Sequence, residues 1–418
     1  MENTTVLREV LETTVGGTYD VIVCGGGPAG SAAAIAAGRA GARVLLLEAQ
    51  NALGGMWTSG FVNPLFDAEH KAGIMRELID DLKAAGKWGG FWKISFNYEY
   101  MRALLDRKCA EAGVTVLLNT RVCRVLRDGD RVTGIVTENR DGRRAWYAGV
   151  VIDATGDAET AAKAGAAFQI GDEETGECQA MTLMFLVSGI PESMKDGKMV
   201  QEELVEAFTK AGKPERVPFL YPYLIPAPES GFGVFQLTHM RGYDPLTEEG
   251  VSAATAAGRA QVIEVFEAFR KYIPEFAELS LITSAPMLGI RESRRIVGEY
   301  TLDLPDMERG AVFEDGITVV HFNIDIHDAK NNGQRCFKTK PYQIPYRCLI
   351  PRGIEGMLVA GRAISGSHVA MASYRVTGDC CAMGEAAGYA AAEAVRQNKS
   401  VRAVTADEIL RHKNGMDE

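Results

Sequence analysis

The sequence predicts an α/β protein in which an antiparallel β-meander interrupts a mostly parallel sheet, with a mixed α+β part inserted into the chain. Two observations support this class. An apolar run at 21–24 leads through a glycine-rich turn into an Ala-rich segment, and a long Ala/Gly-rich segment from about 377 to 396 closes the chain. The 418 residues exceed the usual size of one domain, so we expect two closely joined domains.

The amino-terminal unit is a predicted strand, turn, helix and strand. Val21–Cys24 forms the first strand, and the glycine turn opens a helix over 31–40. A second buried strand follows over 44–47, with Glu48 at its carboxyl end. Such a βαβ unit begins a parallel sheet.

Successive apolar and β-branched runs predict the meander. Asp-Gly turns at 128–129 and 141–142 separate three of these runs and favour hairpins. The last run leads into Ala154-Thr155-Gly156-Asp157, where a strand again meets a glycine turn. The predicted strands are Val114–Leu118, Arg121–Leu126, Val132–Glu138 and Ala145–Ile152.

The rest of the chain is divided between two predicted domains. An amphipathic helix is expected over 259–273, where Pro274 ends it. A last strand over 357–361 precedes the closing helix, in which Gly384 and Gly388 leave one face flat enough to lie close against a neighbour. We assign 1–60, 100–167 and 351–418 to a nucleotide-binding domain, and 61–99 and 168–350 to a discontinuous substrate or cap domain.

Composition argues against several classes of protein. The formal net charge of −10 disfavours nucleic-acid binding. The longest apolar runs fall short of the roughly eighteen residues that span a membrane, and the first twenty residues lack the apolar core of a signal peptide. We therefore expect a cytoplasmic protein without a membrane partner. The eight cysteines include no C-x-x-C pair, so free thiols are expected.

Gly25, Gly27 and Gly30 form the G-x-G-x-x-G pattern of dinucleotide-binding turns. The first glycine permits the turn, the second admits a pyrophosphate, and the third allows close packing of helix and strand. The helix N-terminus then faces the anion, and the Glu48 carboxylate can accept hydrogen bonds from a ribose. The pattern predicts a dinucleotide site, with a tightly packed structural turn as the alternative.

Further motifs specify the cofactor. Together with Gly54-Gly55, the segments 289–300, 344–347 and 361–384 resemble the FAD-dependent oxidoreductase family of the two-dinucleotide-binding-domain flavoproteins. The resemblance covers nearly the whole chain. It implies FAD on a Rossmann-like domain, with the isoalloxazine at the domain interface and the closing helix aimed at its N1 and C2 carbonyl edge. Arg362 stands where many relatives in the wider superfamily carry Asp.

The glycine motif and the resemblance together predict the residues that bind FAD. Met56 and Trp57 would wall the flavin or the substrate pocket, with core packing as the other interpretation. The predicted set is Gly25, Gly27, Pro28, Ala29, Gly30, Glu48, Gly54, Gly55, Met56, Trp57, Ala154, Thr155, Gly156, Asp157, Gly361, Arg362 and Gly378.

Three residues before the closing helix are candidates for catalysis. The resemblance places His368 beside the isoalloxazine, and an imidazole can hold or release a proton near neutral pH. Tyr374 is a candidate proton donor. Arg375 is a candidate substrate anchor or stabiliser of reduced flavin, with a structural ion pair as the alternative.

Residues 318–328 alternate between apolar and polar side chains, which predicts a strand. His321, Asn323, Asp325 and His327 would share one face, lining the substrate pocket or facing solvent. His321 and His327 are therefore further catalytic candidates. A metal site on this face lacks a second ligand cluster, so no metal is predicted.

The cluster Arg291, Glu292, Arg294, Arg295 and Glu299 has two interpretations. A salt-bridge network between domains is favoured over a substrate anchor. The sequence leaves the electron donor or acceptor and the oligomeric state open.

The function we expect is hydride transfer between flavin N5 and the C–OH or C–NH centre of a small polar organic substrate. Reduction of an activated C=C bond is the first alternative, and it would use Arg and His to anchor a carboxylate near the ring. An NAD(P)H-dependent hydroxylase and an FAD-holding electron-transfer subunit without a substrate pocket are the others.

Overall fold

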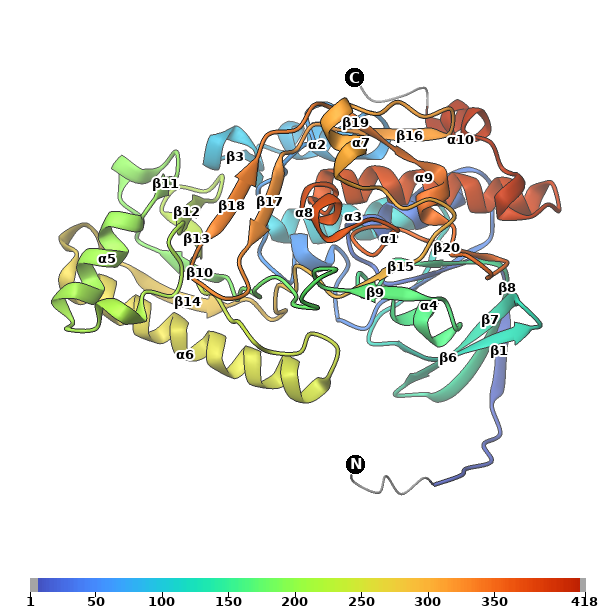
Figure 1. Cartoon of the computed structure of the whole chain (residues 1–418), viewed down its shortest axis with the longest axis horizontal. Helices are drawn as coiled ribbons and strands as arrows, with labels where there is room; N and C mark the ends of the chain where they lie inside the picture. The colour runs from blue at the N-terminus through green and yellow to red at the C-terminus, as the bar shows by residue number, and fades with distance from the viewer. Residues whose placement is uncertain (1–6, 414–418) are drawn as a thin grey trace.

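A computed structural model describes residues 7–413, so the outer ends of the predicted segments 1–60 and 351–418 lie outside the described residues. Figure 1 shows an elongated molecule with a sheet and two long helices at one end and a smaller sheet at the other. Within residues 7–413, no helix combines the length and apolar character that a membrane crossing requires.

The larger sheet has the predicted parallel part and meander, except that the strand predicted over Val114–Leu118 pairs parallel with β2 and lies outside the meander. Its parallel part runs β5–β2–β1–β8, and β20 pairs parallel with the end of β8. The start of β8 instead pairs antiparallel with β7, which continues to β6. The bounds are β1 Thr14–Cys24, β2 Val44–Leu47, β5 Thr115–Leu117, β6 Arg121–Asp128, β7 Arg131–Asn139, β8 Gly142–Asp153 and β20 Met357–Val359.

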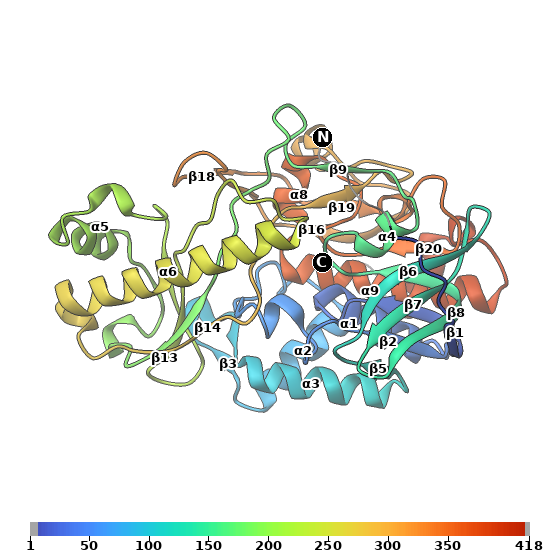
Figure 2. The ribbon, with the colours of Figure 1, turned by 90° about the horizontal axis from the view of Figure 1, so that it is seen from below.

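Helices α1 (Pro28–Arg39) and α9 (Thr377–Arg396) pack against each other beside this sheet (Figure 2). A Cβ added at Gly384 would lie 2.0 Å from the Ala29 oxygen, and one at Gly388 would lie 2.2 Å from the Ala33 oxygen. The flat face predicted for α9 is therefore the face that lies on α1. The adjoining helices are α2 (Gly73–Ala84), α3 (Tyr98–Glu111) and α10 (Ala406–Lys413).

The smaller sheet is antiparallel, in the order β11–β12–β13–β10–β14, and α5 (Gln201–Lys210) and α6 (Glu248–Tyr272) accompany it. Helix α6 begins well before the predicted position 259, because the Thr247 side chain caps it by accepting from Gly250 N and its first turns lack the apolar stripe. The strands are β10 Phe185–Ser188, β11 Lys198–Met199, β12 Tyr223–Pro226, β13 Phe232–Gln236 and β14 Ser280–Ser284.

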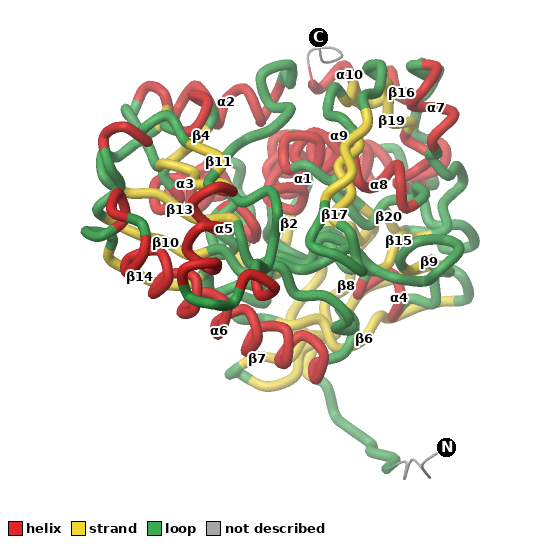
Figure 3. Tube along the Cα trace, turned by 60° about the vertical axis from the view of Figure 1, so that its left-hand side comes forward, coloured by secondary structure: helices red, strands yellow, loops and turns green. Residues whose placement is uncertain are grey.

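Short two-stranded ribbons complete the fold, and Figure 3 shows β17 near α8 and α9. β16 pairs with β19, whereas β17 pairs with β18, so the single strand predicted over 318–328 was wrong: the chain turns between Val320 and Ile324. The remaining strands and α-helices are β3 Trp88–Gly89, β4 Ser95–Phe96, β9 Phe168–Ile170, β15 Arg294–Ile296, β16 Gly316–Val320, β17 Ile324–His327, β18 Gln334–Phe337, β19 Tyr342–Pro345, α4 Glu159–Lys163, α7 Leu304–Arg309 and α8 His368–Tyr374.

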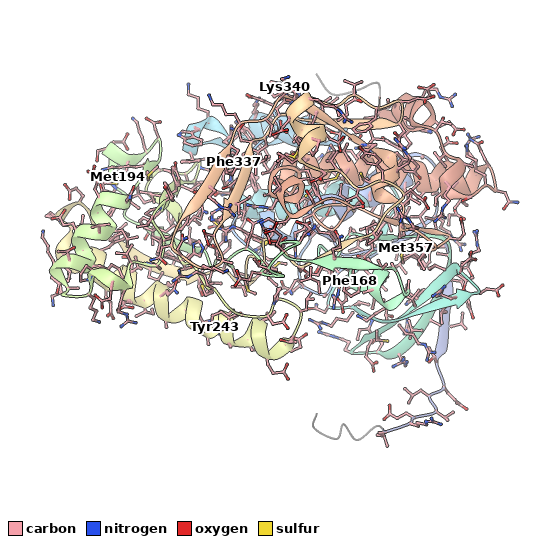
Figure 4. The ribbon with its side chains drawn as sticks, in the orientation of Figure 1. Phe168, Met194, Tyr243, Phe337, Lys340 and Met357 are labelled. Carbon is pink, nitrogen blue, oxygen red and sulfur yellow. The ribbon has the colours of Figure 1, made fainter. Side chains whose placement is uncertain are left out.

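Separate hydrophobic cores occupy the two ends of the molecule. One holds the α1 and α9 side chains together with residues of the 317–350 region, such as Ile324 and Ile344. Another holds the aromatic side chains Phe185, Phe235 and Phe269 of the smaller sheet and α6. Figure 4 labels Met194 at this outer end and Met357 at the opposite end, with Phe337 of β18 between them. The exact division into domains stays a prediction.

Candidate active site

The glycine turn between β1 and α1 forms one wall of a cavity of about 230 Å³. Gly25 has a φ of 98°, and a Cβ at Gly30 would lie 1.7 Å from the Gly25 oxygen, so both positions require glycine. A Cβ at Gly27 would instead meet open space within the described chain. This space in front of the α1 N-terminus fits the pyrophosphate of a dinucleotide.

Glu48 lies at the end of β2 and lines the same cavity. Its two carboxylate oxygens accept from Gly26 N at 2.6 Å and from Gln50 N at 2.7 Å. Burial raises the pKa of Glu48, although these backbone donors act in the opposite direction. The carboxylate is thereby held in place, with lone pairs left for a ribose hydroxyl.

Most of the residues predicted to bind FAD line this cavity. Four lie behind its wall: Gly30, Gly54, the fully buried Trp57, and Gly378, where a Cβ would lie 2.6 Å from the Phe66 and Asp67 oxygens. Those in the wall are Gly25, Gly27, Pro28, Ala29, Glu48, Gly55, Met56, Ala154, Thr155, Gly156, Asp157, Gly361 and Arg362.

Arg362 crosses from the last glycine turn to the turn after β8. Its Nη2 donates to Asp157 Oδ1 at 2.6 Å, and Ser293 Oγ donates to the same oxygen. Arg362 Nε is buried and has no hydrogen-bond partner within residues 7–413. The charge of this guanidinium is therefore balanced by Asp157, while its remaining N–H groups can still donate to a bound group.

The N-terminus of α9 opens into the cavity beside this arginine. Thr377 and Cys380 line it, and the turn that begins α9 has no side-chain cap from the described residues. Uncapped helix N–H groups favour negative charge. This end and the space at Gly27 suit negatively charged groups of a bound dinucleotide, and the orientation of FAD stays a prediction.

A second cavity of about 350 Å³ adjoins the first. Both are lined by Met56, Arg362, Arg375 and Thr377, so the two spaces meet at the start of α9. The far part of the second cavity is aromatic. Arg291, Asp325 and His327 lie in its wall with Arg375 and form its charged part.

Arg375 and Arg291 differ in how they are neutralised. Arg375 Nη2 donates to the Asp325 backbone oxygen at 2.9 Å and to Oδ2 at 3.3 Å. Arg291 Nη1 donates to the Ala180 backbone oxygen at 2.6 Å, and among the described residues no carboxylate forms an ion pair with it. Burial and the charge of Arg375 lower the pKa of Arg291 to about 9. Arg291 is therefore still charged at pH 7, and its charge is not balanced by a salt bridge.

His327 and Asp325 form a pair in the wall of this cavity. His327 Nε2 lies 3.3 Å from Asp325 Oδ2, and its Nδ1 is buried without a partner in the described part of the chain. Burial and the charge of Arg291 lower the pKa of His327 to about 4. Burial opposes the ionisation of Asp325, but His327 and Arg375 hold its pKa below the ordinary range. At neutral pH we assign a neutral imidazole and an ionised carboxylate.

His368 and Tyr374, at the two ends of α8, lie outside the linings of both cavities. His368 is 4% exposed, and its Nδ1 lies 2.9 Å from both oxygens of Glu292, which also pairs with Arg295. The Tyr374 hydroxyl donates to the Ile364 backbone oxygen at 3.2 Å. Their catalytic roles stay predictions.

His321 also lies outside both linings. Its backbone N–H donates to Asp67 Oδ2 at 2.8 Å, and its ring centroid lies 4.4 Å from that of His70. It is separated from Asn323, Asp325 and His327, which do line the second cavity, because the chain turns after β16. Its catalytic role likewise stays a prediction, and no cluster of potential metal ligands occurs among residues 7–413.

The sequence did not predict the aromatic wall. For the charged cluster that contains Arg291, a salt-bridge network was favoured over a substrate anchor. Arg295 and Glu292 form a salt bridge, as the favoured interpretation of the cluster requires, whereas Arg291 faces the second cavity. The order of charged residues in the sequence cannot show which of these neighbouring side chains faces the cavity, because that depends on how the chain packs. Trp92 and Tyr223 of the aromatic wall carry no motif.

The parallel sheet, the glycine turn and the helix aimed into the same cleft define a dinucleotide-binding α/β protein. A sequence model described as FAD dependent oxidoreductase matches residues 20–412, and the chain belongs to this family. FAD is its cofactor, and oxidoreductase is its class of enzyme, as the sequence predicts.

Two curated relatives match about a third of the chain. Thiamine thiazole synthase of Aeropyrum pernix is 35% identical over 153 residues, which are 33% of this chain and 54% of the relative. Digeranylgeranylglycerophospholipid reductase 2 of Methanopyrus kandleri is 33% identical over 149 residues, 33% of this chain and 37% of the relative. The matched regions thus span about half or less of these relatives' own lengths.

A solved structure extends the likeness to the whole fold. The geranylgeranyl bacteriochlorophyll reductase-like protein of Thermoplasma acidophilum aligns over 96% of this chain and 83% of its own, with a TM-score of 0.50 and 14% identity. At that identity the likeness shows the fold alone.

Proposed function

We propose that this FAD-dependent oxidoreductase transfers a hydride between flavin N5 and the C–OH or C–NH centre of a small substrate that carries a carboxylate. The observation behind the carboxylate is Arg291. It is charged, lines the second cavity, and lacks a carboxylate partner among the described residues. A carboxylate on the substrate would complete that ion pair as a charge-assisted hydrogen bond.

The position of the second cavity supports the hydride step. When bound, FAD supplies the acceptor of the hydride. Arg362, Arg375 and Thr377 belong to the walls of both cavities, so a molecule held by Arg291 lies next to the cofactor space. Orientation of the substrate by the Arg291 guanidinium is the main contribution of the chain to this step.

His327 is the base in this proposal. With Nε2–H directed at Asp325, Nδ1 is the nitrogen that can accept the substrate O–H or N–H proton as the hydride leaves carbon. The low pKa of His327 keeps the imidazole neutral, which is the form a base requires. Asp325 is a positioning residue, because it holds the ring and stabilises the imidazolium that forms.

Reduction of a C=C bond conjugated to a carboxylate is the second candidate. The second cavity favours it, because Arg291 and His327 both lie in its wall and can anchor a carboxylate next to the cofactor space. The Methanopyrus kandleri relative is named a reductase, which also supports this candidate.

An anaerobic titration of the FAD-loaded protein separates the two candidates. Oxidised protein is mixed with 2-hydroxy and 2-amino acids, and dithionite-reduced protein with 2-enoic acids, while the visible flavin band is followed. Bleaching by the first set supports C–OH or C–NH oxidation, and recovery of the band with the second supports C=C reduction. The matching amides lack the negative charge and should be far poorer substrates.

Arg291→Met tests the anchor in the same experiment. It should remove the preference for acids over amides, whereas Arg140→Met, in an exposed hairpin turn, should keep it. Retention of the preference by Arg291→Met would rule out Arg291 as the carboxylate anchor.

A further inference from the structure

Trp92 lies in the wall of the second cavity and outside the lining of the FAD cavity. Its φ is 45°, and that of Lys93 is 61°, so two successive non-glycine residues adopt the left-handed region. The side chain is 58% exposed. A large apolar residue held exposed in a strained backbone needs an explanation, since such strain collects at ligand-binding sites.

The segment that holds Trp92 is fixed by its neighbours. A Cβ at Gly90 would lie 2.5 Å from the Pro226 oxygen, so this backbone presses directly against β12. Ile94 accepts a backbone hydrogen bond from Leu65 N at 2.9 Å on the other side. Trp92 therefore belongs to a built wall and not to a loose loop.

Aromatic rings surround the exposed indole. Phe91 stacks on Trp92 with centroids 4.3 Å apart, and Tyr223 and Phe66 meet it edge-on at 6.0 and 6.2 Å. All four side chains line the second cavity. The cluster thus offers ring faces and edges to a ligand, at positions where one more ring would continue the same packing.

We propose that the substrate is an aryl-substituted carboxylic acid and that Trp92 is the residue that selects its ring. The inference rests on the proposed function, because it takes the carboxylate to be bound at Arg291. A cavity of about 350 Å³ lies at the small end of ligand sites, so the fitting substrate has one ring and a short acid chain. Aromatic pairing then adds affinity beyond the area that the ring buries.

The test uses carboxylic acids that lack the C–OH or C–NH group, so they can bind but cannot transfer a hydride to the flavin. Phenylacetate, cyclohexylacetate and acetate are titrated into the oxidised, FAD-loaded protein, and the dissociation constants are taken from the perturbation of the flavin spectrum. We expect phenylacetate to bind about two- to tenfold more tightly than cyclohexylacetate, a compound of similar size without π-electrons. Acetate should bind most weakly.

Variants assign that preference to the indole. Trp92→Ala should abolish the preference for phenylacetate over cyclohexylacetate while acetate affinity stays unchanged, and Trp92→Phe should retain most of it. Tyr147→Ala, which removes an exposed ring on β8, is the control and should behave as wild type. Circular dichroism and bound flavin content verify that each variant is folded.

Two results would overturn the inference: a wild-type protein without the phenyl preference, or Trp92→Ala that keeps it. Failure of the proposed function gives a different pattern. In that case no acid, acetate included, depends on Arg291, or the acids bind as expected but no hydroxy, amino or unsaturated analogue exchanges electrons with the flavin.

Discussion

Arg375 holds Asp325 twice, donating from Nη2 to its backbone oxygen at 2.9 Å and to its carboxylate at 3.3 Å. The contact ties the residue between α8 and α9 to β17. The same carboxylate lies 3.3 Å from His327 Nε2. Asp325 therefore balances the charge of Arg375 and orients His327, which leaves Arg291 as the cation available to an anionic substrate.

Asp325→Asn should separate catalysis from binding. The amide keeps the size of the side chain but removes the charge that orients His327, so kcat should fall about a hundredfold or more. KM should not rise, because the cavity becomes more positive and attracts the substrate anion. Steady-state kinetics measures both constants, with Asp141→Asn in an exposed turn as the control. A higher KM with unchanged kcat would show that Asp325 serves binding alone.

The rate of flavin reduction should be nearly independent of pH between about 5.5 and 8. Burial and Arg291 lower the pKa of His327 from 6.5 to about 4, so the neutral base persists until the pH approaches 4. The rate then falls as the pH decreases, because protonation removes the base. Stopped-flow measurements of flavin reduction across this pH range check the prediction. A fall in the rate with a midpoint near pH 6.5, the ordinary pKa of histidine, would contradict it.

His368→Gln should affect stability more than turnover. Loss of the imidazole removes one partner of the buried Glu292 carboxylate, which keeps Arg295, and should cost about 1–3 kcal/mol of unfolding free energy. Because His368 lies outside both cavity linings, kcat should change by less than about threefold, under 1 kcal/mol of barrier. Thermal melts and kinetics on one preparation decide the matter. A large loss of kcat at unchanged Tm would restore His368 as the acid or base.

The local elements were predictable because each depends on neighbouring residues. The glycine turn, the meander and helix α9 follow from apolar period and turn chemistry, and the predicted end at Arg396 agrees with the structure. The substrate side was less predictable. The alternating pattern predicted His321 and His327 on one face of a single strand. The chain turns after Val320, so the two side chains lie in different environments. Arg291 and Trp92 are far apart in the sequence, and only the tertiary packing brings them to the same cavity.

Gly27 and Gly30 should respond differently to alanine. A Cβ at Gly30 lies 1.7 Å from the Gly25 oxygen, so Gly30→Ala should unfold or severely destabilise the chain. A Cβ at Gly27 enters open space, and its φ of −69° suits alanine. Gly27→Ala should therefore leave the Tm of the apoprotein nearly unchanged and weaken FAD binding at least about tenfold. Flavin titration measures the affinity for FAD, and thermal melts of the apoprotein measure Tm. An unchanged affinity for FAD would show that the pyrophosphate does not bind next to Gly27.

Lys71 should be essential for stability although it lies outside both cavities. Its ammonium is fully buried and donates to the Val319 backbone oxygen and to Asp67 at 3.3 Å. It also forms an ion pair at 2.7 Å with Asp379, in the first turn of α9. Lys71→Met leaves two carboxyl groups buried without their cation, which should cost about 3–5 kcal/mol. Burial already raises the pKa of Asp379 well above its ordinary range, so removal of the cation pushes it further toward the neutral form.

Adding Asp379→Asn to Lys71→Met should therefore recover part of the lost stability, since one uncompensated carboxyl group is removed. Urea unfolding of the wild type, the two single variants and the double variant gives the free energies of unfolding for a double-mutant cycle on the Lys71–Asp379 contact. If Lys71→Met costs less than about 1 kcal/mol, the cluster does not hold the start of α9 in place. A double variant no more stable than Lys71→Met would show that the loss comes from packing of the lysine stem and not from the unpaired charge.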